Sequence, residues 1–326
     1  MSSVEQVEAE VARLAPVVRA ARQQIGRVLV GQSTMVDGLL LGLLADGHVL
    51  LEGAPGLAKT TAVKAMSDTL QLRFSRVQFT PDLLPADLVG TQIYEPRTGE
   101  FRTRQGPIFA NLVLADEINR APAKVQSALL EAMQERQVTL GDQTYPLPKP
   151  FLVLATQNPI EQEGTYPLPE AQTDRFLLKL RVDYPTLDDE LEIVTRSALP
   201  IPKLDTVASL ESILEMQALV KSLKITDPLM RYIVDLVRAT RNPGAVDSSL
   251  ARAVEYGASP RASIAIAAAS RGRAFLEGRG YCLPEDVKAV APDVLRHRVL
   301  PTYEAEADGL TPDAIVKRLL ELVKMG

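Results

Sequence analysis

The sequence predicts an α/β domain built on a mostly parallel sheet, followed by an all-helical domain. Between residues 48 and 183, short apolar runs alternate with longer polar or helical segments, which is the pattern of parallel strands joined by crossover helices. After Pro185 the strand signals vanish, and apolar residues recur at helical spacing to the end of the chain. We therefore divide the 326 residues into 1–186 and 187–326.

Composition limits the class of protein. The chain is 46% hydrophobic and 24% charged, with a net charge of −5, which argues against a generally basic surface for nucleic acid or anionic membrane. One cysteine, Cys282, excludes an internal disulfide, and two histidines with that thiol cannot form a zinc site by themselves. The first residues are acidic where a signal peptide is basic and then apolar, and no apolar run approaches a membrane span. We expect a cytosolic protein that does not enter membranes.

The first segment of the chain carries a helical stripe with a proline inside it. Because Pro16 removes a helix hydrogen bond, the pattern predicts two helices packed on a core rather than one long coiled-coil helix. The apolar residues of the stripe, spaced mostly by three and four, are Val4, Val7, Val11, Leu14, Val18, Ile25 and Val28.

Five apolar runs are the candidate strands of the sheet, and they lie at 49–51, 77–79, 112–115, 152–155 and 177–182. Residues 96–100 resemble a hairpin tip between the second and third runs, and Gly141 and Asp142 form the turn of another hairpin at 137–147. Two β-hairpins are thus inserted into the α/β core. In the second domain, helices are expected to end near Pro243 and Gly278, and another is expected to start at Pro284.

A glycine-rich loop, "GAPGLAKT" at 53–60, joins the first strand to a helical segment. Backbone N–H groups at a helix N-terminus favour phosphate, a lysine such as Lys59 adds charge, and a hydroxyl such as that of Thr60 is a Mg²⁺ ligand. Ala58 stands where the usual pattern has glycine, and we expect it to have a negative φ at the start of the helix, while Gly56 keeps the turn tight. The alternative is a turn that merely joins strand to helix.

Polar side chains follow the third and fourth strands. Asp116 and Glu117 end the third run, at the sheet edge where ligands bind, so one carboxylate can hold Mg²⁺ and the other can orient a water. Asn158 follows the fourth run, where its amide can polarise the γ-phosphate or hold that water. Taken singly, the acids are more often a solvated pair and Asn158 a turn residue, but the upstream loop favours the functional reading.

Two arginines stand at positions of interest. Arg175 lies in "PEAQTDRF" just before the last strand, and Arg261 lies in "GASPRAS" at the start of a helix in the second domain. Each alone is more often a solvated surface charge.

Four motifs together resemble one family. "GAPGLAKT", "LADEINRAP", "ATQNPIEQEGTYPLPEAQTDRF" and "GASPRAS" occur in this order, and the chain resembles the MoxR family of AAA+ ATPases from residue 30 to residue 298. The resemblance implies a P-loop AAA+ parallel-sheet core with inserted β-hairpins, followed by an all-helical lid domain. In that family alanine often replaces the last loop glycine, so Ala58 conforms to the resemblance.

The resemblance also implies residue roles. Lys59 would contact the β- and γ-phosphates, Thr60 and Asp116 would belong to the Mg²⁺ shell, Glu117 would orient the attacking water, and Asn158 would be the first sensor. Arg175 resembles an arginine finger that reaches a neighbouring subunit's ATP. Arg261 resembles the second sensor on the lid, and the motifs leave open whether it acts in its own subunit or in the next. The nucleotide-contacting set would be Val30, Gly31, Gln32, Gly53, Pro55, Gly56, Leu57, Ala58, Lys59, Thr60 and Thr61, with the first three over the adenine.

The function implied is that of a ring-forming, hexameric chaperone that hydrolyses Mg-ATP and remodels or matures partner protein complexes. ATP or ADP and Mg²⁺ would be its cofactors, and both a protein client and a separate adaptor with a von Willebrand factor A domain are expected.

Two alternatives remain open. A nucleic-acid motor or loader is supported by Arg97, Arg102 and Arg104 on or near the first hairpin, but opposed by the acidic charge, the absence of tryptophan and only 5% aromatics. A nucleotide-gated scaffold with little hydrolysis is weakened because every expected catalytic residue is present. The sequence identifies neither the client nor the adaptor.

Overall fold

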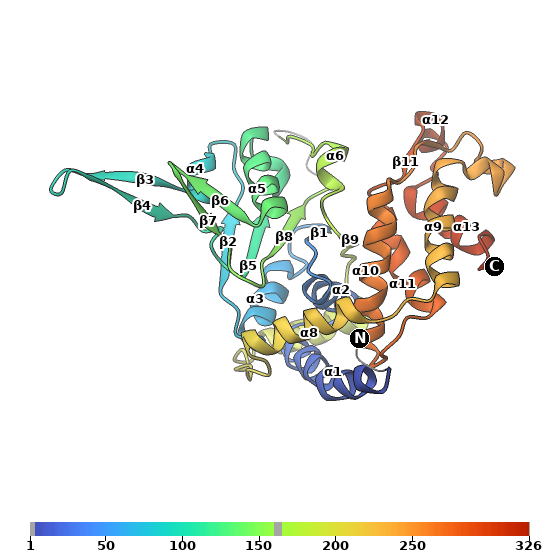
Figure 1. The fold of residues 1–326 in the computed structure, drawn as a ribbon, viewed down its shortest axis with the longest axis horizontal. Helices are drawn as coiled ribbons and strands as arrows, with labels where there is room; N and C mark the ends of the chain where they lie inside the picture. The colour runs from blue at the N-terminus through green and yellow to red at the C-terminus, as the bar shows by residue number, and fades with distance from the viewer. Residues whose placement is uncertain (1–3, 160–164, 326) are drawn as a thin grey trace.

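The α/β part and the helical part of the chain lie side by side in the structure, a computed structural model (Figure 1). The structure describes residues 4–159 and 165–325, so residues 160–164 of the third motif lie outside the described residues. The first hairpin projects from one end of the molecule, and the last helix and the C-terminus lie at the other (Figure 1). In the part of the chain that is described, no helix combines the length and the apolar character needed to cross a membrane.

The five predicted strands are present and form one parallel sheet. Their spatial order is β2-β5-β8-β1-β9. The three inner strands are almost fully buried, which explains why they read as uninterrupted apolar runs. The strands are β1 (Val49–Glu52), β2 (Phe74–Gln78), β5 (Leu112–Asp116), β8 (Leu152–Gln157) and β9 (Leu178–Arg181).

Helices cover both faces of this sheet. Because side chains alternate along a strand, Leu51 and Leu114 face one side, where they pack with α1, α2 and α3. Val113 and Val153 face the other side, where α5 covers them. The helices of this part are α1 (Val4–Gly26), α2 (Ser33–Leu44), α3 (Lys59–Thr69), α5 (Ala123–Glu135), the short α4 (Pro85–Val89) and α6 (Glu170–Thr173), and the 3₁₀ turn η1 (Ile118–Arg120).

Helix α1 is continuous across Pro16, so the predicted break into two helices is wrong. A proline inside a helix costs roughly 3 kcal/mol through the lost hydrogen bond and the steric clash. Residues on both sides of it, among them Leu14, Ala15 and Val18, are buried against the core. This packing holds the helix together where local propensity favours an interruption.

Both predicted hairpins are present. They are β3 (Gly90–Glu95) with β4 (Glu100–Gln105), and β6 (Gln137–Leu140) with β7 (Gln143–Pro146). Side chains connect them, since the Gln92 amide donates to the Leu140 carbonyl at 3.4 Å and the Thr103 and Tyr145 hydroxyls lie 3.0 Å apart. The second hairpin therefore holds the first one through side-chain hydrogen bonds, and the tip of the first hairpin extends outward.

The helical part packs directly against the helices of the α/β part. Gln217 of α8 donates to the Leu43 carbonyl of α2 at 2.6 Å, and Gly272 of α10 packs against Leu41, which also belongs to α2. One hydrophobic cluster spans α1, α2 and the helices of this part, except for α7, which has no buried residue. These helices are α7 (Leu187–Ser197), α8 (Leu210–Ser222), α9 (Asp227–Arg241), α10 (Pro260–Leu276), α11 (Pro284–Leu295), α12 (Tyr303–Ala307) and α13 (Pro312–Leu322), with 3₁₀ turns η2 (Pro243–Ala245) and η3 (Ser248–Leu250).

A small antiparallel ribbon, β10 (Val254–Tyr256) with β11 (Leu300–Pro301), also lies in this part. The expectation that no strand follows Pro185 is therefore wrong in this detail. Pairs this short have too few alternating residues to leave a sequence pattern.

Candidate functional site

The glycine-rich loop connects β1 to α3 and lies at the carboxyl edge of the sheet. A Cβ atom on Gly53 would lie 2.6 Å from the Val182 carbonyl oxygen, so only glycine lets the loop pass the end of β9. Gly56 has a φ of +84°, which glycine adopts without strain. The sequence therefore places glycine where the turn requires it.

Ala58 corrects one prediction. Its φ is 55° and its ψ is 22°, so it is left-handed and precedes α3 instead of opening the helix with a negative φ. This conformation costs an alanine roughly 1–2 kcal/mol. The loop imposes it because the chain must turn sharply between Gly56 and the first helical residue, Lys59. The protein therefore accepts alanine at this position at the cost of backbone strain.

The predicted phosphate-binding residues, with the exception of Gly53, line one cavity of about 470 Å³. Lys59 lies half-buried in it and donates from Nζ to the Gly53 carbonyl at 2.6 Å. Burial lowers the pKa of Lys59, and the nearby Asp116 and Glu117 carboxylates partly offset this. The lining comprises Pro55, Gly56, Leu57, Ala58, Lys59, Thr60, Thr61, Arg76, Gln78, Asp116, Glu117, Thr156 and Asn158.

A buried threonine connects the two acids. Thr156, at 1% exposure, donates from Oγ1 to Asp116 Oδ1 at 2.6 Å and accepts from the Glu117 N–H at 2.8 Å. Glu117 itself is left-handed, with a φ of 56°, so its backbone turns away from β5 directly after Asp116. Sequence reasoning missed Thr156, although a polar residue just before Gln157 at the end of an apolar strand was a visible signal.

Two side chains of the edge strand β2 also reach the acids. Arg76 pairs with Asp116 at 2.6 Å, and the Gln78 amide donates to Glu117 Oε2 at 2.8 Å. Arg120 lies 3.2 Å from the same Glu117 oxygen. Each acid is thus held by a neighbouring strand or turn. The sequence did not indicate Arg76 and Gln78, because only the spatial order of the strands shows that β2 lies beside β5.

The donor set fits Mg²⁺ with a nucleotide phosphate. The Asp116 carboxylate and the Thr60 hydroxyl are hard oxygen ligands, and both line the cavity with Lys59. Within residues 4–159 and 165–325, no cluster of three or more His, Cys, Asp or Glu could hold a metal ion. A cation bound through few protein oxygens, with phosphate and water completing its shell, is the usual arrangement for Mg²⁺.

A second cavity, of about 280 Å³, adjoins the first and shares Gly56, Leu57, Ala58 and Thr61 with it. Val30 and Gln32 line this second cavity, together with apolar side chains such as Val28 and Ile193. Gly31 lies between them with a φ of +72°. The "VGQ" segment therefore lies next to the loop, with a more apolar space beside the polar one.

The two predicted arginines lie elsewhere. Neither Arg175 nor Arg261 lines the cavity of the loop, and both line a different cavity of about 260 Å³ with Asp174 and His48. Arg175 donates from Nη1 to the Leu130 carbonyl at 3.0 Å, while its buried Nε has no partner. Arg261 is largely exposed, and its Nη1 lies 3.7 Å from Asp174. The structure brings the two arginines together and keeps them out of the loop cavity.

Arg298, which the sequence analysis did not select, anchors the turn that carries Arg175. Its nearly buried guanidinium pairs with Asp174 at 2.6 Å and donates to the carbonyls of Asp174 at 3.0 Å and Phe176 at 2.7 Å. Burial lowers the pKa of Arg298, and the pairing with Asp174 opposes this. One residue of the helical part thus fixes the turn on both sides of Arg175.

His48 lies buried beside this cavity as a neutral ring. Its Nδ1 accepts from the Val153 N–H at 2.9 Å, so its Nε2 carries the proton toward the Met133 carbonyl at 3.1 Å. Burial, followed by the charge of Arg136, lowers the pKa of His48 to about 3. The ring therefore has a structural role at neutral pH.

Comparison with known proteins agrees with these features. The family model described as "ATPase family associated with various cellular activities (AAA)" matches residues 48–178, and the AAA lid domain model matches residues 247–319. Chaperone MoxR1 of Mycobacterium tuberculosis is 50% identical over 93% of this chain and 80% of its own length. The uncharacterized protein YeaC of Bacillus subtilis is 45% identical over 96% of both chains.

A crystal structure of an ATPase candidate from Cytophaga hutchinsonii is 47% identical and superposes with a TM-score of 0.91. The match covers 99% of this chain and 98% of that one. The glycine-rich loop and the two acids at the end of β5 lie within the first matched range, and α10, α11 and α12 lie within the second. The chain belongs to the MoxR family of AAA+ ATPases.

Proposed function

We propose that the chain binds and hydrolyses Mg-ATP. The observation that carries this proposal is that Lys59, Asp116, Glu117 and Asn158 line one cavity although they come from three separate segments. Lys59 holds the β- and γ-phosphates, and Glu117, fixed by Gln78, orients the attacking water. Asn158 contacts the γ-phosphate at the end of β8.

Mg²⁺, bound at Thr60 and Asp116, would neutralise phosphate charge during the reaction. The contacts of Asp116 prepare this site. Its two carboxylate oxygens accept from different groups, Oδ1 from Thr156 and Oδ2 from Arg76. Its orientation is therefore fixed by the protein before any ligand is present. Val30, Gly31 and Gln32 lie over the adenine.

We further propose that the active form is a ring, hexameric as in the resemblance, in which Arg175 and Arg261 act on the nucleotide of the neighbouring subunit. Both arginines line a cavity separate from their own loop cavity, which supports action in trans. The isolated chain would then lack the positive charge that stabilises the transition state.

An exposed apolar stripe on α7 supports self-association. Leu187, Leu191 and Val194 occupy i, i+4 and i+7 positions, and they are 75%, 59% and 65% exposed. A row of large apolar side chains beside the nucleotide cavities is typical of a surface that another protein covers. In the proposed ring, the neighbouring copy covers it.

The work done by this ring is proposed to be the remodelling of partner proteins in the cytoplasm. The name of the relative Chaperone MoxR1 supports this role. So does the first hairpin, where the exposed rings of Tyr94 and Phe101 lie with their centroids 5.4 Å apart and their planes tilted by 55°. They stand on a projecting ribbon that would face the central pore of the ring and contact a client. A separate adaptor with a von Willebrand factor A domain would select the client.

The experiment that tests the ring mixes two inactive variants. Glu117→Gln loses the water-orienting group but keeps Arg175, whereas Arg175→Ala loses the arginine but keeps an intact loop cavity. If Arg175 acts in trans, each variant alone hydrolyses ATP slowly, and their mixture regains part of the parent rate. The parent rate per subunit should also rise with protein concentration, as measured by phosphate release.

Arg238→Ala is the matched control, because it removes an exposed arginine of α9 that is remote from both cavities. It should hydrolyse ATP at the parent rate. A mixture no more active than its two components would refute action in trans while leaving the ATPase assignment intact. Full activity of Glu117→Gln alone would refute the catalytic assignment.

A further inference from the structure

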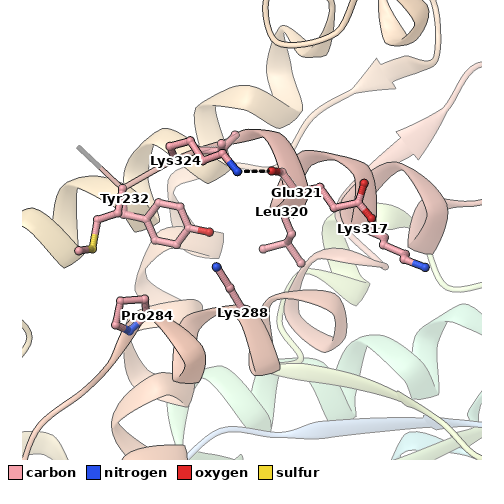
Figure 2. A pocket seen from close by; sticks show the side chains of 9 residues that line it. Tyr232, Pro284, Lys288, Lys317, Leu320, Glu321 and Lys324 are labelled. Carbon is pink, nitrogen blue, oxygen red and sulfur yellow. Dashed lines mark hydrogen bonds between the residues drawn. The ribbon is translucent and has the colours of Figure 1, made fainter.

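A pocket of about 420 Å³ lies in the helical part, far from the loop cavity. It is formed between α9, α11, α13 and the segment that follows α13 (Figure 2). Its walls combine apolar side chains such as those of Pro284 and Leu320 with one acid, Glu321, and three lysines, Lys288, Lys317 and Lys324. Its volume falls in the range of pockets that bind small ligands.

The floor of the pocket carries a polar group without a partner. Tyr232 is 2% exposed, and its hydroxyl makes no hydrogen bond. Figure 2 shows this hydroxyl directed into the space between Lys288 and Leu320. Leaving a buried hydroxyl unpaired costs about 1–3 kcal/mol, so a ligand that accepts its hydrogen bond recovers this energy. Burial raises the pKa of Tyr232, which keeps the phenol protonated and able to donate.

The three lysines have no carboxylate partners. Among the ion pairs of the described residues, none involves Lys288, Lys317 or Lys324. Lys324 donates only to the backbone carbonyl of Glu321, at 2.9 Å, and the Glu321 carboxylate lies instead 3.4 Å from Arg318. The lining therefore holds three lysines outside any ion pair of the described part of the chain and one carboxylate, Glu321, that pairs with Arg318, which leaves a local excess of positive charge in a chain with a net charge of −5.

We propose that this pocket binds an acidic peptide segment of a partner protein, with its carboxylates at the lysines and at the Tyr232 hydroxyl and an apolar side chain against Leu320 and Pro284. The three lysines come from different segments, so a run of acids satisfies them better than one carboxylate does. The apolar walls favour a peptide over a bare anion, because such a ligand also buries nonpolar surface.

The place of the pocket agrees with a protein partner. The last helix lies at the opposite end of the molecule from the first hairpin (Figure 1). This step rests on the proposed function, because in a ring whose hairpins face the pore the pocket faces outward. A partner bound there leaves the pore open for a client.

The test is a direct binding measurement on the full chain without nucleotide. A short blocked peptide that alternates glutamate and leucine, labelled with a fluorophore, is titrated with protein and followed by anisotropy. The parent should bind it, and more weakly at higher salt. Lys288→Gln should bind roughly tenfold more weakly, since it removes one charge-assisted hydrogen bond. Lys203→Gln, which neutralises an exposed lysine outside the pocket, should bind like the parent.

Tyr232→Phe separates a binding role from a structural one. It keeps the ring and removes only the hydroxyl, so peptide binding should weaken several-fold while the melting temperature of the free chain does not fall. A drop in melting temperature without a change in binding would show that the hydroxyl serves the fold and would overturn its role here.

Two further outcomes would overturn the proposal. One is a peptide with glutamine in place of glutamate that binds as tightly as the acidic one. The other is a single-stranded oligonucleotide that binds more tightly and displaces the peptide, which would make the pocket a nucleic-acid site. ATP hydrolysis is not part of this assay, so failure here leaves the proposed ATPase standing, and failure of the mixing experiment leaves the peptide result standing.

Discussion

Replacing Thr156 with valine tests whether one buried hydroxyl holds both acids of the site. Valine keeps the shape of threonine but can neither donate to Asp116 nor accept from the Glu117 N–H, the two contacts at 2.6 and 2.8 Å. The lost charge-assisted bond is worth about 1.5–3 kcal/mol, and an unpaired buried N–H costs about 1–3 kcal/mol. Because the two effects share one atom and do not add fully, we expect a loss of about 3 kcal/mol in folding stability.

This loss corresponds to a fall of roughly 4 °C in melting temperature for a chain of this size. Thr156→Val should also turn over ATP about tenfold or more slowly, since Glu117 loses the backbone anchor that positions it. ATP binding should remain, because Lys59 and its loop are not touched. The assays are a thermal melt, phosphate release and titration with a fluorescent ATP analogue.

Thr156→Ser is the matched control, since serine keeps the hydroxyl and loses only a methyl group, at a cost of about 1 kcal/mol. Its turnover should stay close to that of the parent. If Thr156→Val matches the parent in both stability and turnover, the hydroxyl does not position the acids and the argument fails.

Three further predictions follow from other parts of the molecule. Leu191→Glu should weaken self-association and flatten the concentration dependence of hydrolysis, measured by sedimentation velocity, whereas Val234→Glu on α9 should leave both unchanged. His48 and His297, a buried residue just after α11, both have pKa values below the ordinary 6.5 because burial disfavours the charged ring, and the pKa of His48 is about 3. The unfolded chain therefore binds more protons at acid pH. Above pH 6.5 these histidines should therefore not lower the free energy of unfolding. Below pH 6.5 it should fall by up to about 1.4 kcal/mol per pH unit for each histidine. A free energy of unfolding, measured with urea, that stays constant down to about pH 5 would contradict this. Arg298→Lys keeps the charge but not the planar group that contacts several carbonyls, so it should lower turnover without weakening ATP binding, and equal turnover would show that Arg298 does not position Arg175.

The sequence predicted the parts of the fold that local pattern determines. Apolar runs identified the five strands because buried parallel strands have few polar positions, and turn residues identified both hairpins. The acids and Asn158 could be placed together because the carboxyl ends of parallel strands meet at one edge. Their individual catalytic roles stay predictions.

The errors and omissions arise where tertiary contacts outweigh local preference. Packing on both sides of Pro16 keeps α1 continuous, and the loop forces Ala58 into the left-handed region. Arg76 and Gln78 reach the site because β2 lies beside β5, which sequence order alone does not give. Arg298 is more than a hundred residues from the turn it holds, so no local motif could indicate the contact.

The contacts of Arg298 make the arginine-bearing turn part of the same rigid body as α11. Any rotation of the helical part relative to the sheet must either break several buried hydrogen bonds or carry Arg175 with it. In the proposed ring, the angle of one lid therefore changes the electrostatic field at the next subunit's nucleotide. The order in which subunits hydrolyse ATP would then be set by mechanical coupling between neighbouring subunits.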